Sequence, residues 1–194
     1  MKKKFLALIL ALISITGISS AQKAGIKTNL FTDAFLSPNI GVEIGLAPKW
    51  SLDIPVELNA WTLSHDRNWR HLSAQPEVRY WFCERFAGNF IGVHVHGGWF
   101  NVGGINMDFK FLGTDFSRLR DSRFQGWFAG AGFSYGHSWI LSEHWNFEAE
   151  IGLGWSYTRF DRFRCKGCGT KLDEDKSHNY YGPTKVALSL VYLF

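Results

Sequence analysis

Two short motifs carry side chains that could bind a metal ion. His94 and His96 stand two residues apart in HVHGGW, so a β-strand would place both imidazoles on one face. Cys165 and Cys168 form a CxxC pair in CKGCG, which suits half of a zinc site, a redox pair or a disulfide. A zinc site needs three or four ligands, and the cysteine pair would need His178 or another chain to complete one. We therefore expect no metal or cofactor, polar but non-ligating histidines, and a disulfide or idle thiols at the cysteines.

A group of carboxylates could do acid–base chemistry. Glu148 and Glu150, with Glu57 and Glu77, could supply the paired carboxylates of such an enzyme. They could instead form ion pairs with basic side chains inside the protein. We favour ion pairs, because the eight-stranded fold argued below leaves an interior that side chains fill. The expected network comprises Lys27, Glu43, Asp53, Glu57, Glu77, Arg79, Glu148, Glu150 and Lys185.

Nucleophilic catalysis has one candidate pair, His137 and Ser138. Adjacent residues on a strand point to opposite faces, so the histidine could not activate the serine there. No phosphate-binding glycine loop, HExxH or GxSxG motif is present. Arginines in FSRLRDSR (116–123) and HDRNWRH (65–71) could contact lipid phosphates or lie in solvated loops. We therefore predict no enzyme activity and no catalytic residues.

The N-terminus is typical of a secretory signal peptide. Three lysines precede an apolar stretch at 5–18, which is too short to span a membrane, and Ser19-Ser20-Ala21 offers small residues for cleavage. Residues 1–21 are the predicted signal, and residues 22–194 the predicted domain. Removal of the three lysines lowers the formal charge from +4 to +1, so the basic pI gives no argument for nucleic-acid binding.

Period-two alternation dominates the remaining chain, and helical periodicity is hard to find. It predicts an all-β fold with eight strands, at about 23–32, 39–47, 50–61, 71–82, 89–103, 123–139, 145–158 and 182–194. Short turns at 47–49, 83–88 and 141–144 alternate with longer connections at 33–38, 62–70, 104–122 and 159–181. This pattern is typical of an up-and-down transmembrane β-barrel in the outer membrane, with both termini on the short-turn, periplasmic side.

The direction of the apolar face separates a membrane barrel from a lipocalin-like barrel, which turns that face inward. Tryptophans near strand ends suggest two interfacial girdles, which favours the membrane. The periplasmic girdle would hold Trp50, Trp81, Trp139, Trp145 and Phe194, and the outer one Trp61, Trp99, Trp127 and Trp155. The glycine- and serine-rich polar face would then point inward, where its charges must pair.

The chain ends KVALSLVYLF, with Phe194 on the apolar face. In lipid no backbone group can stay unpaired, so the last strand must close against the first. The ending resembles the C-terminal signature of bacterial outer-membrane proteins, which the barrel-assembly machinery reads.

Four segments resemble a family of small, uncharacterised outer-membrane barrels of Bacteroidota, a domain-of-unknown-function family. They are KTNLFTDAFLSPNIGVEIGLAPKWSLDI, QPEVRYWFCERFAGNFIGVHVHGGWFNVGG, GWFAGAGFSYGHSWILSEHW and YYGPTKVALSLVYL. The resemblance implies a fold and a location but no reaction or ligand. More distantly, the architecture is similar to OmpA- and OmpX-type barrels.

These expectations describe a non-enzymatic integral outer-membrane protein that contacts lipid and lipopolysaccharide. Its role would be envelope structure or surface interaction through the loops at 104–122 and 159–181. Two alternatives stay open: a narrow channel or small-molecule carrier, and a lipid A-modifying barrel enzyme.

Overall fold

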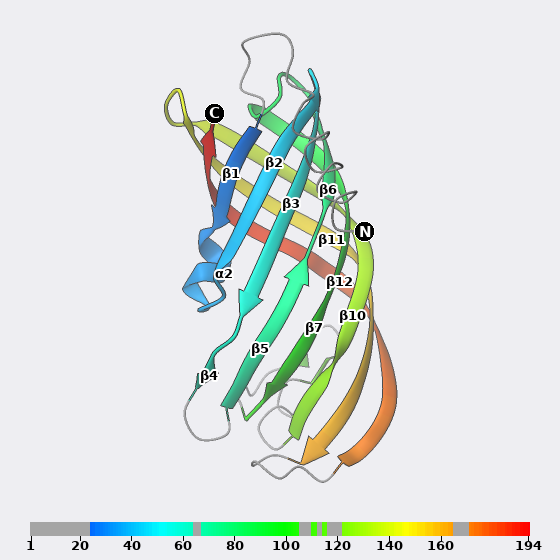
Figure 1. Ribbon diagram of the computed structural model, residues 1–194. Coiled ribbons are helices and arrows are strands. Elements are labelled where there is room, and N and C mark those ends of the chain that lie inside the picture. The colour runs from blue at the N-terminus through cyan, green and yellow to red at the C-terminus, as the bar shows by residue number, and fades with distance from the viewer. Residues whose placement is uncertain (1–23, 64–66, 105–109, 112–113, 116–121, 165–170) are drawn as a thin grey trace, which may run out of the picture.

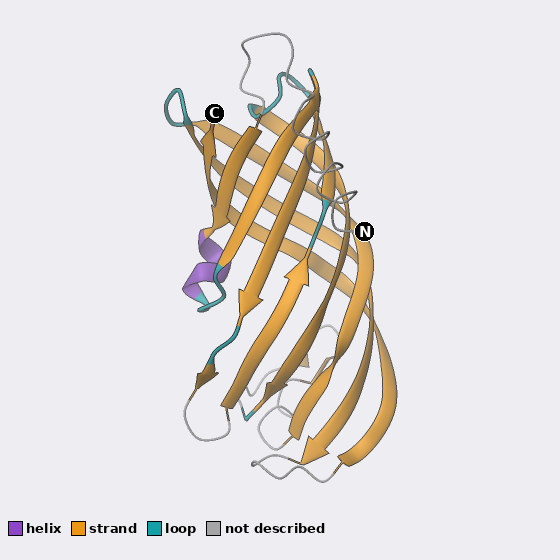
Figure 2. Ribbon diagram, in the orientation of Figure 1, coloured by secondary structure: helices purple, strands orange, loops and turns teal. Residues whose placement is uncertain are grey.

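The computed structural model describes residues 24–63, 67–104, 110–111, 114–115, 122–164 and 171–194. One antiparallel sheet closes into a ring of eight strands. In chain order the ring contains β1 (Ala24–Asn29), β2 (Asn39–Ala47), β3 (Trp50–Asn59), β5 (Arg67–Ala74) with β6 (Glu77–Trp81), β7 (Gly88–Gly103), β10 (Ser122–Ile140), β11 (Trp145–Arg164) and β12 (Lys171–Leu193). Figures 1 and 2 show the tilted strands wrapping around a common axis.

The ring closes between the first and last strands. β12 pairs with β1 in the register Gly25↔Leu193 to Asn29↔Ser189, and β10 pairs with both β7 and β11. The backbone N–H of Phe194 donates to the carbonyl of Ala24 at 3.0 Å, so the terminal residue belongs to the seam. The predicted eight-stranded ring and its closure by the last strand are confirmed.

The first strand is shorter than predicted. β1 ends at Asn29 instead of continuing to 32, and a short helix, α2 (Leu30–Ala34), follows it. The Asn29 side chain caps this helix by accepting from the N–H of Phe31 at 3.1 Å. An asparagine side chain competes with ladder bonds for nearby backbone groups, which explains why the strand stops here.

The fourth predicted strand is interrupted. β5 and β6 occupy one place in the ring and are separated by Gln75 and Pro76. Proline has no N–H to donate to the ladder, but the carbonyl of Pro76 still accepts from Val95 N–H at 3.1 Å. The connection predicted at 62–70 also contains ladder pairs, because β4 (Thr62–Leu63) pairs with the start of β5.

The connection predicted at 159–181 is largely a β-hairpin. β11 continues to Arg164 and β12 begins at Lys171, with register shifts between Phe160 and Phe163. Cross-strand ion pairs stabilise this extension: Arg159 binds Asp175, and Lys171 Nζ lies 3.1 Å from Asp161 Oδ2. Within 104–122, β8 (Lys110–Phe111) pairs with β9 (Thr114–Asp115) as a separate two-stranded sheet.

Apolar side chains lie on the outside of the barrel and charged ones on the inside. Phe133, Leu153 and Val93 are among the exposed residues, at 73, 59 and 54 %. Glu43, Glu77 and Arg79 are at most 1 % exposed. This distribution is the reverse of that in a water-soluble barrel. Among the described residues, no helix combines the length and hydrophobicity that a membrane crossing needs.

Candidate functional site

The interior is organised around one guanidinium. Arg79 on β6 contacts five buried carboxylates at distances between 2.6 and 3.1 Å, from four strands of the ring. They are Glu43, Asp53, Glu77, Glu148 and Glu150. A planar guanidinium with five donors can satisfy several carboxylates at once.

Two lysines complete the network from opposite sides of the seam. Lys27 on β1 binds Glu43 and lies 3.1 Å from Glu148 Oε2. Lys185 on β12 lies 3.0 Å from Glu77 Oε2 and 3.1 Å from Glu150 Oε1. Of the nine residues predicted to form a network, the structure brings these eight together.

Glu57 is the exception. Its Oε1 lies 2.9 Å from Nε2 of His71, on the neighbouring strand β5, and no ion pair links it to Arg79 or to either lysine. The prediction that Glu57 belongs to the network is therefore wrong. Glu57 is four residue pairs further along the strand than Asp53, and the guanidinium does not reach that far.

His94 and His96 lie side by side in the interior, with ring centroids 5.7 Å apart. His94 contacts Thr184 Oγ1 at 3.0 Å and Glu77 Oε2 at 3.4 Å. Gly130 and Gly132 make room for both rings, since a Cβ at either position would lie within 2.7 Å of a histidine nitrogen. Among the described residues, no group of three or more potential ligands is spaced to hold a metal ion.

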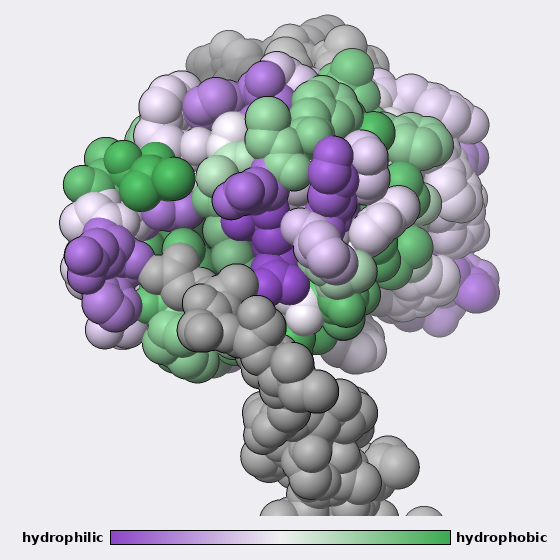
Figure 3. All heavy atoms as spheres, turned by 90° about the horizontal axis from the view of Figure 1, so that it is seen from above, coloured by the Kyte–Doolittle hydropathy of each residue, from purple (hydrophilic) through white to green (hydrophobic). Residues whose placement is uncertain are grey.

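Aromatic side chains fill the end of the barrel that carries the termini. Trp81, Phe86 and Phe90 are at most 4 % exposed and pack together, with the rings of Trp81 and Phe90 4.6 Å apart. Val191 and Leu193 of β12 belong to the same buried cluster, so aromatic and aliphatic side chains together form an apolar plug. Figure 3 looks onto this end, where the surface not covered by grey atoms is closely filled.

Trp81 was predicted to lie in the periplasmic girdle, and this is wrong. Its side chain points inward, and its indole N–H donates to Ser51 Oγ at 2.9 Å. Strand parity could have placed it, because its neighbours Tyr80 and Phe82 occupy outward positions. The other predicted interfacial aromatics are exposed: Trp50, Trp61, Trp99, Trp127, Trp139, Trp145, Trp155 and Phe194.

A polar cavity of about 180 Å³ adjoins the charge network. Lys27, Asp53, Arg79, Glu150 and Lys185 line it from the network. Asn29, Thr32, Val186 and Ala187 line it at the junction of α2 and β12. The cavity therefore reaches from the buried charges to the place where β1 gives way to the helix.

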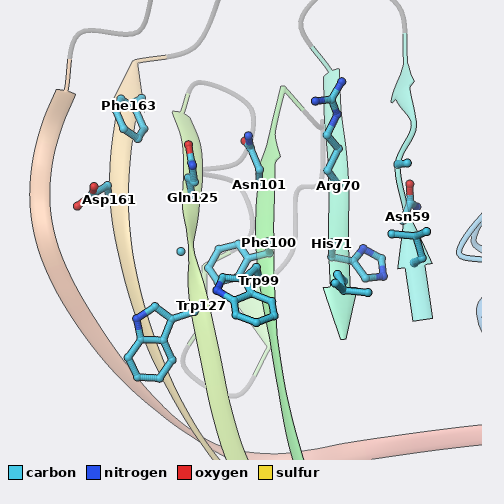
Figure 4. Close-up of a pocket in the computed structure, with 14 residues that line it drawn as sticks. Asn59, Arg70, His71, Trp99, Phe100, Asn101, Gln125, Trp127, Asp161 and Phe163 are labelled. Carbon is cyan, nitrogen blue, oxygen red and sulfur yellow. The ribbon is translucent and has the colours of Figure 1, made fainter. Parts of the chain in front are cut away.

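A second depression, of about 590 Å³, lies on the outer face. Arg70, Asn101, Gln125 and Asp161 are cross-strand neighbours there. Leu72, Trp99 and Trp127 form the adjacent row, nearer the termini. Figure 4 shows the polar side chains in a line across the strands beside the two tryptophans. The outward face thus changes from apolar to polar at this level.

The hairpin extension carries exposed ion pairs outside this apolar band. The hydrogen bond from Arg159 lowers the pKa of the Asp175 carboxyl below its usual value. The backbone N–H of Asp175 donates to Asp161 Oδ1 at 2.9 Å, and this bond lowers the pKa of Asp161. Asp175 itself adopts a left-handed conformation, with φ at 57°.

Several predicted features fall outside the described residues. They are the signal peptide at 1–21, the pair Cys165 and Cys168, and the loop arginines Arg118 and Arg120. Arg123 is described, and its guanidinium lies 5.0 Å from the centre of the Phe163 ring. Cys83 is an exposed free thiol.

Sequence reasoning missed the polar cluster that supports α2. Asn39 donates to Thr32 Oγ1 and to Asp33 Oδ1, both at 2.9 Å, while Thr28 Oγ1 donates to Asp33 Oδ2 at 2.7 Å. The available signal was NLFTD, in which an asparagine precedes a possible first helical turn that contains an aspartate.

Together, these features define a closed, eight-stranded antiparallel barrel with a charged interior and an apolar exterior. The chain matches the family described as "Protein of unknown function (DUF3575)" over residues 6–194, and it belongs to that family. No curated protein and no solved structure matches it.

Proposed function

We propose that this protein is an integral β-barrel of the bacterial outer membrane, with a non-enzymatic role in envelope structure or surface interaction. One observation carries the proposal: apolar side chains cover the outside of a closed ring, and its ionised side chains pair within it. Lipid is the solvent that suits such an exterior, and closure of the ring leaves no sheet edge in the hydrocarbon.

Exposed aromatic residues support a specific position in the bilayer. Trp50, Trp139 and Trp145 lie near the turns at the end that carries the termini, and Trp99, Trp127 and Trp155 lie nearer the other end. Aromatic belts of this kind mark the two interfaces of a membrane. Residues 1–21 would direct export, the termini would face the periplasm, and the C-terminal strand would be read by the barrel-assembly machinery.

Surface interaction would use the segments beyond the outer belt, 104–122 and 159–181. The β11–β12 hairpin carries exposed charged side chains such as Arg159 and Asp175. A rigid scaffold that presents polar segments is a common arrangement for binding. Lipopolysaccharide is the partner expected at the polar row of the outer depression, which begins where the apolar face ends.

A channel is the less favoured role, because two layers cross the interior. Arg79 and its carboxylates form one layer, and the plug of Trp81, Phe86 and Phe90 forms the other. Conductance across a planar bilayer tests this directly: steady openings would favour the channel.

A lipid-modifying enzyme is less favoured too, since His137 binds Asn89 and lies on the face opposite Ser138.

Protease treatment of intact cells tests the proposal as a whole. Peptides released from 159–181, with protection of 83–88 and 141–144, are the expected result. In unboiled gels the protein should migrate as a compact, heat-modifiable band, and it should require detergent for extraction. Extraction without detergent would contradict the membrane assignment, and cleavage at the short turns would contradict the orientation.

A further inference from the structure

The outer half of β12 has a strand partner on one side only. β12 pairs with β11 over almost its whole length. On the other side, β1 pairs with it only from Asn29↔Ser189 to Gly25↔Leu193, and the Asn29 side chain extends this contact to Val186. Beyond that point no strand within the described part of the chain pairs with this side of β12. The outer half of the last strand is therefore an edge of the sheet.

Strand parity shows which backbone groups point to this edge. Alternate residues of a strand direct their N–H and C=O groups to opposite neighbours. Asn29 binds the N–H of Leu188 and the C=O of Val186, two residues whose side chains are exposed on the outside of the barrel. The outward-facing residues of β12 thus direct their backbone groups toward the side of β1.

The same alternation resumes beyond a bulge. Thr184 has no partner in the register with β11, so the outward orientation returns at Pro183. Tyr181, Asn179 and Ser177 follow at every second position, and the Tyr181 side chain is 69 % exposed. The backbone groups of these residues therefore point to the edge.

The edge is blocked next to β1 and open further out. Pro183 has no N–H, and its C=O accepts from the hydroxyl of Tyr180 at 3.3 Å. The C=O of Thr184 accepts from Nε2 of Gln75 at 3.1 Å. Further out, at residues 177–181, no hydrogen bond from another described residue engages the groups that point to the edge. A donor and an acceptor at every second residue are matched by another extended backbone.

The position of this edge makes it accessible to a partner. Residues 174–179 are exposed on both faces of the strand, whereas a strand inside the barrel wall buries one face. Tyr181 pairs with Trp155, a member of the proposed outer aromatic belt. The open part of the edge therefore begins at that belt and continues away from the termini.

We propose that the edge of β12 at residues 177–181 binds an extended segment of a second protein, which adds a strand to the sheet. The added strand runs antiparallel to β12, as β1 does, and continues the line of β1 beyond α2. Main-chain hydrogen bonds supply the affinity, and an aromatic or β-branched side chain suits the position opposite Tyr181. The inference deepens the proposed surface role and rests on it.

A second copy of this chain does not fit the edge. Two copies inserted the same way round in one membrane are related by an axis along the membrane normal. Such an axis makes their last strands run parallel and places the outer face of one beside the inner face of the other. Two identical edges therefore cannot form a continuous antiparallel ladder, which leaves a different chain as the partner.

Hydrogen exchange measured by NMR in phospholipid nanodiscs tests the site. The probe is a peptide of about seven alternating threonine and valine residues, which favours an extended strand. It should slow amide exchange at Ser177, Asn179 and Tyr181 by at least about tenfold. The amides of Tyr180 and His178 point to β11, so their exchange should stay unchanged.

Backbone methylation of the peptide separates strand addition from side-chain contact. Valine is expected opposite the outward residues of β12, so its N–H groups form the bonds to the edge. Methylation of the valine nitrogens should abolish binding, whereas methylation of the threonine nitrogens should leave it intact. Equal effects of the two sets would overturn strand addition.

Asn179→Pro removes one N–H from the edge, and an edge strand tolerates proline. Asn179→Ala is the matched control, because it removes the same side chain and keeps the N–H. The proline variant should bind the peptide about five- to tenfold more weakly than the alanine variant. Unchanged exchange at Gly25 and Leu193 would show that both variants keep the closed ring. Equal peptide affinity of the two variants would overturn the site.

The wild-type protein without peptide distinguishes this inference from the membrane assignment. Slow exchange at residues 177, 179 and 181 before any peptide is added would show that this chain or a second copy already covers the edge, and would overturn the docking site alone. A barrel that folds and stays monomeric without detergent or lipid would overturn the membrane assignment itself.

Discussion

The side chain of Asn29 pairs with the backbone of Leu188 and so takes the place of a strand residue in the barrel wall. Its Oδ1 accepts from the N–H of Leu188 at 3.0 Å, and its Nδ2 donates to the carbonyl of Val186 at 3.2 Å. An asparagine side chain offers the same acceptor and donor as a peptide group. The ladder thus extends by one step past the end of β1.

Asn29→Ala should weaken the contact of β1 and α2 with β12. Loss of the two bonds to β12 and of the cap on α2 should lower the free energy of unfolding by about 1–3 kcal/mol. The amide of Leu188 should exchange its hydrogen faster, as measured by hydrogen–deuterium exchange in detergent. Asn179→Ala, which removes only an exposed bond to Trp155, is the control. Unchanged exchange at Leu188 would contradict the role of Asn29.

Arg79→Met should be the most damaging substitution in the interior. It leaves five buried carboxylates with two lysines, and loss of one member of a buried ion-pair network costs about 3–5 kcal/mol. Urea unfolding in phospholipid vesicles measures the effect. Arg79→Lys keeps the charge but cannot reach all five partners, so its stability should be intermediate. Equal stability of Arg79→Met and the wild type would show that the ion-pair network does not stabilise the folded barrel.

Substitution of Phe86 by alanine and by glycine should lower the free energy of unfolding by different amounts. Its ring closes the barrel end, but its φ of 66° is left-handed. Phe86→Ala should lower the free energy of unfolding by about 3–4 kcal/mol, because a large buried ring is removed. Phe86→Gly loses the same ring but relaxes the backbone, so it should be more stable than the alanine variant by about 1 kcal/mol. The reverse order in urea unfolding would contradict strain at this turn.

The outer hairpin should loosen in acid. The pKa of Asp161 and of Asp175 is lowered in the folded hairpin, so each contributes stability above its ordinary pKa, and this is lost as pH falls through the lowered value. Amides of residues 159–164 and 171–175 should therefore gain mobility below about pH 4 in NMR relaxation experiments. Arg159→Gln removes the main partner of Asp175 and should shift the transition to higher pH. An identical transition in both proteins would exclude this ion pair as its cause.

Alternation along the chain determined the strand number, the closure and the inward placement of most charges. Val42, Ile44 and Leu46 point out while Glu43 points in, as period two requires. Which charges would meet was harder to predict. Glu57 has the same parity as Asp53, yet only the distance from Arg79 decides that one joins the network and the other pairs with His71.

Local sequence determined where strands run, because alternation is a property of neighbouring residues. The local motif NLFTD also offered a signal for the end of β1, because Asn29 caps α2. Only the tertiary structure decided that the same side chain continues the pairing with β12, far away in the chain. The same holds for the polar cavity. Its wall combines residues of β1, α2, β3, β6, β11 and β12, and such a site depends on ring closure and strand register, which no local pattern encodes.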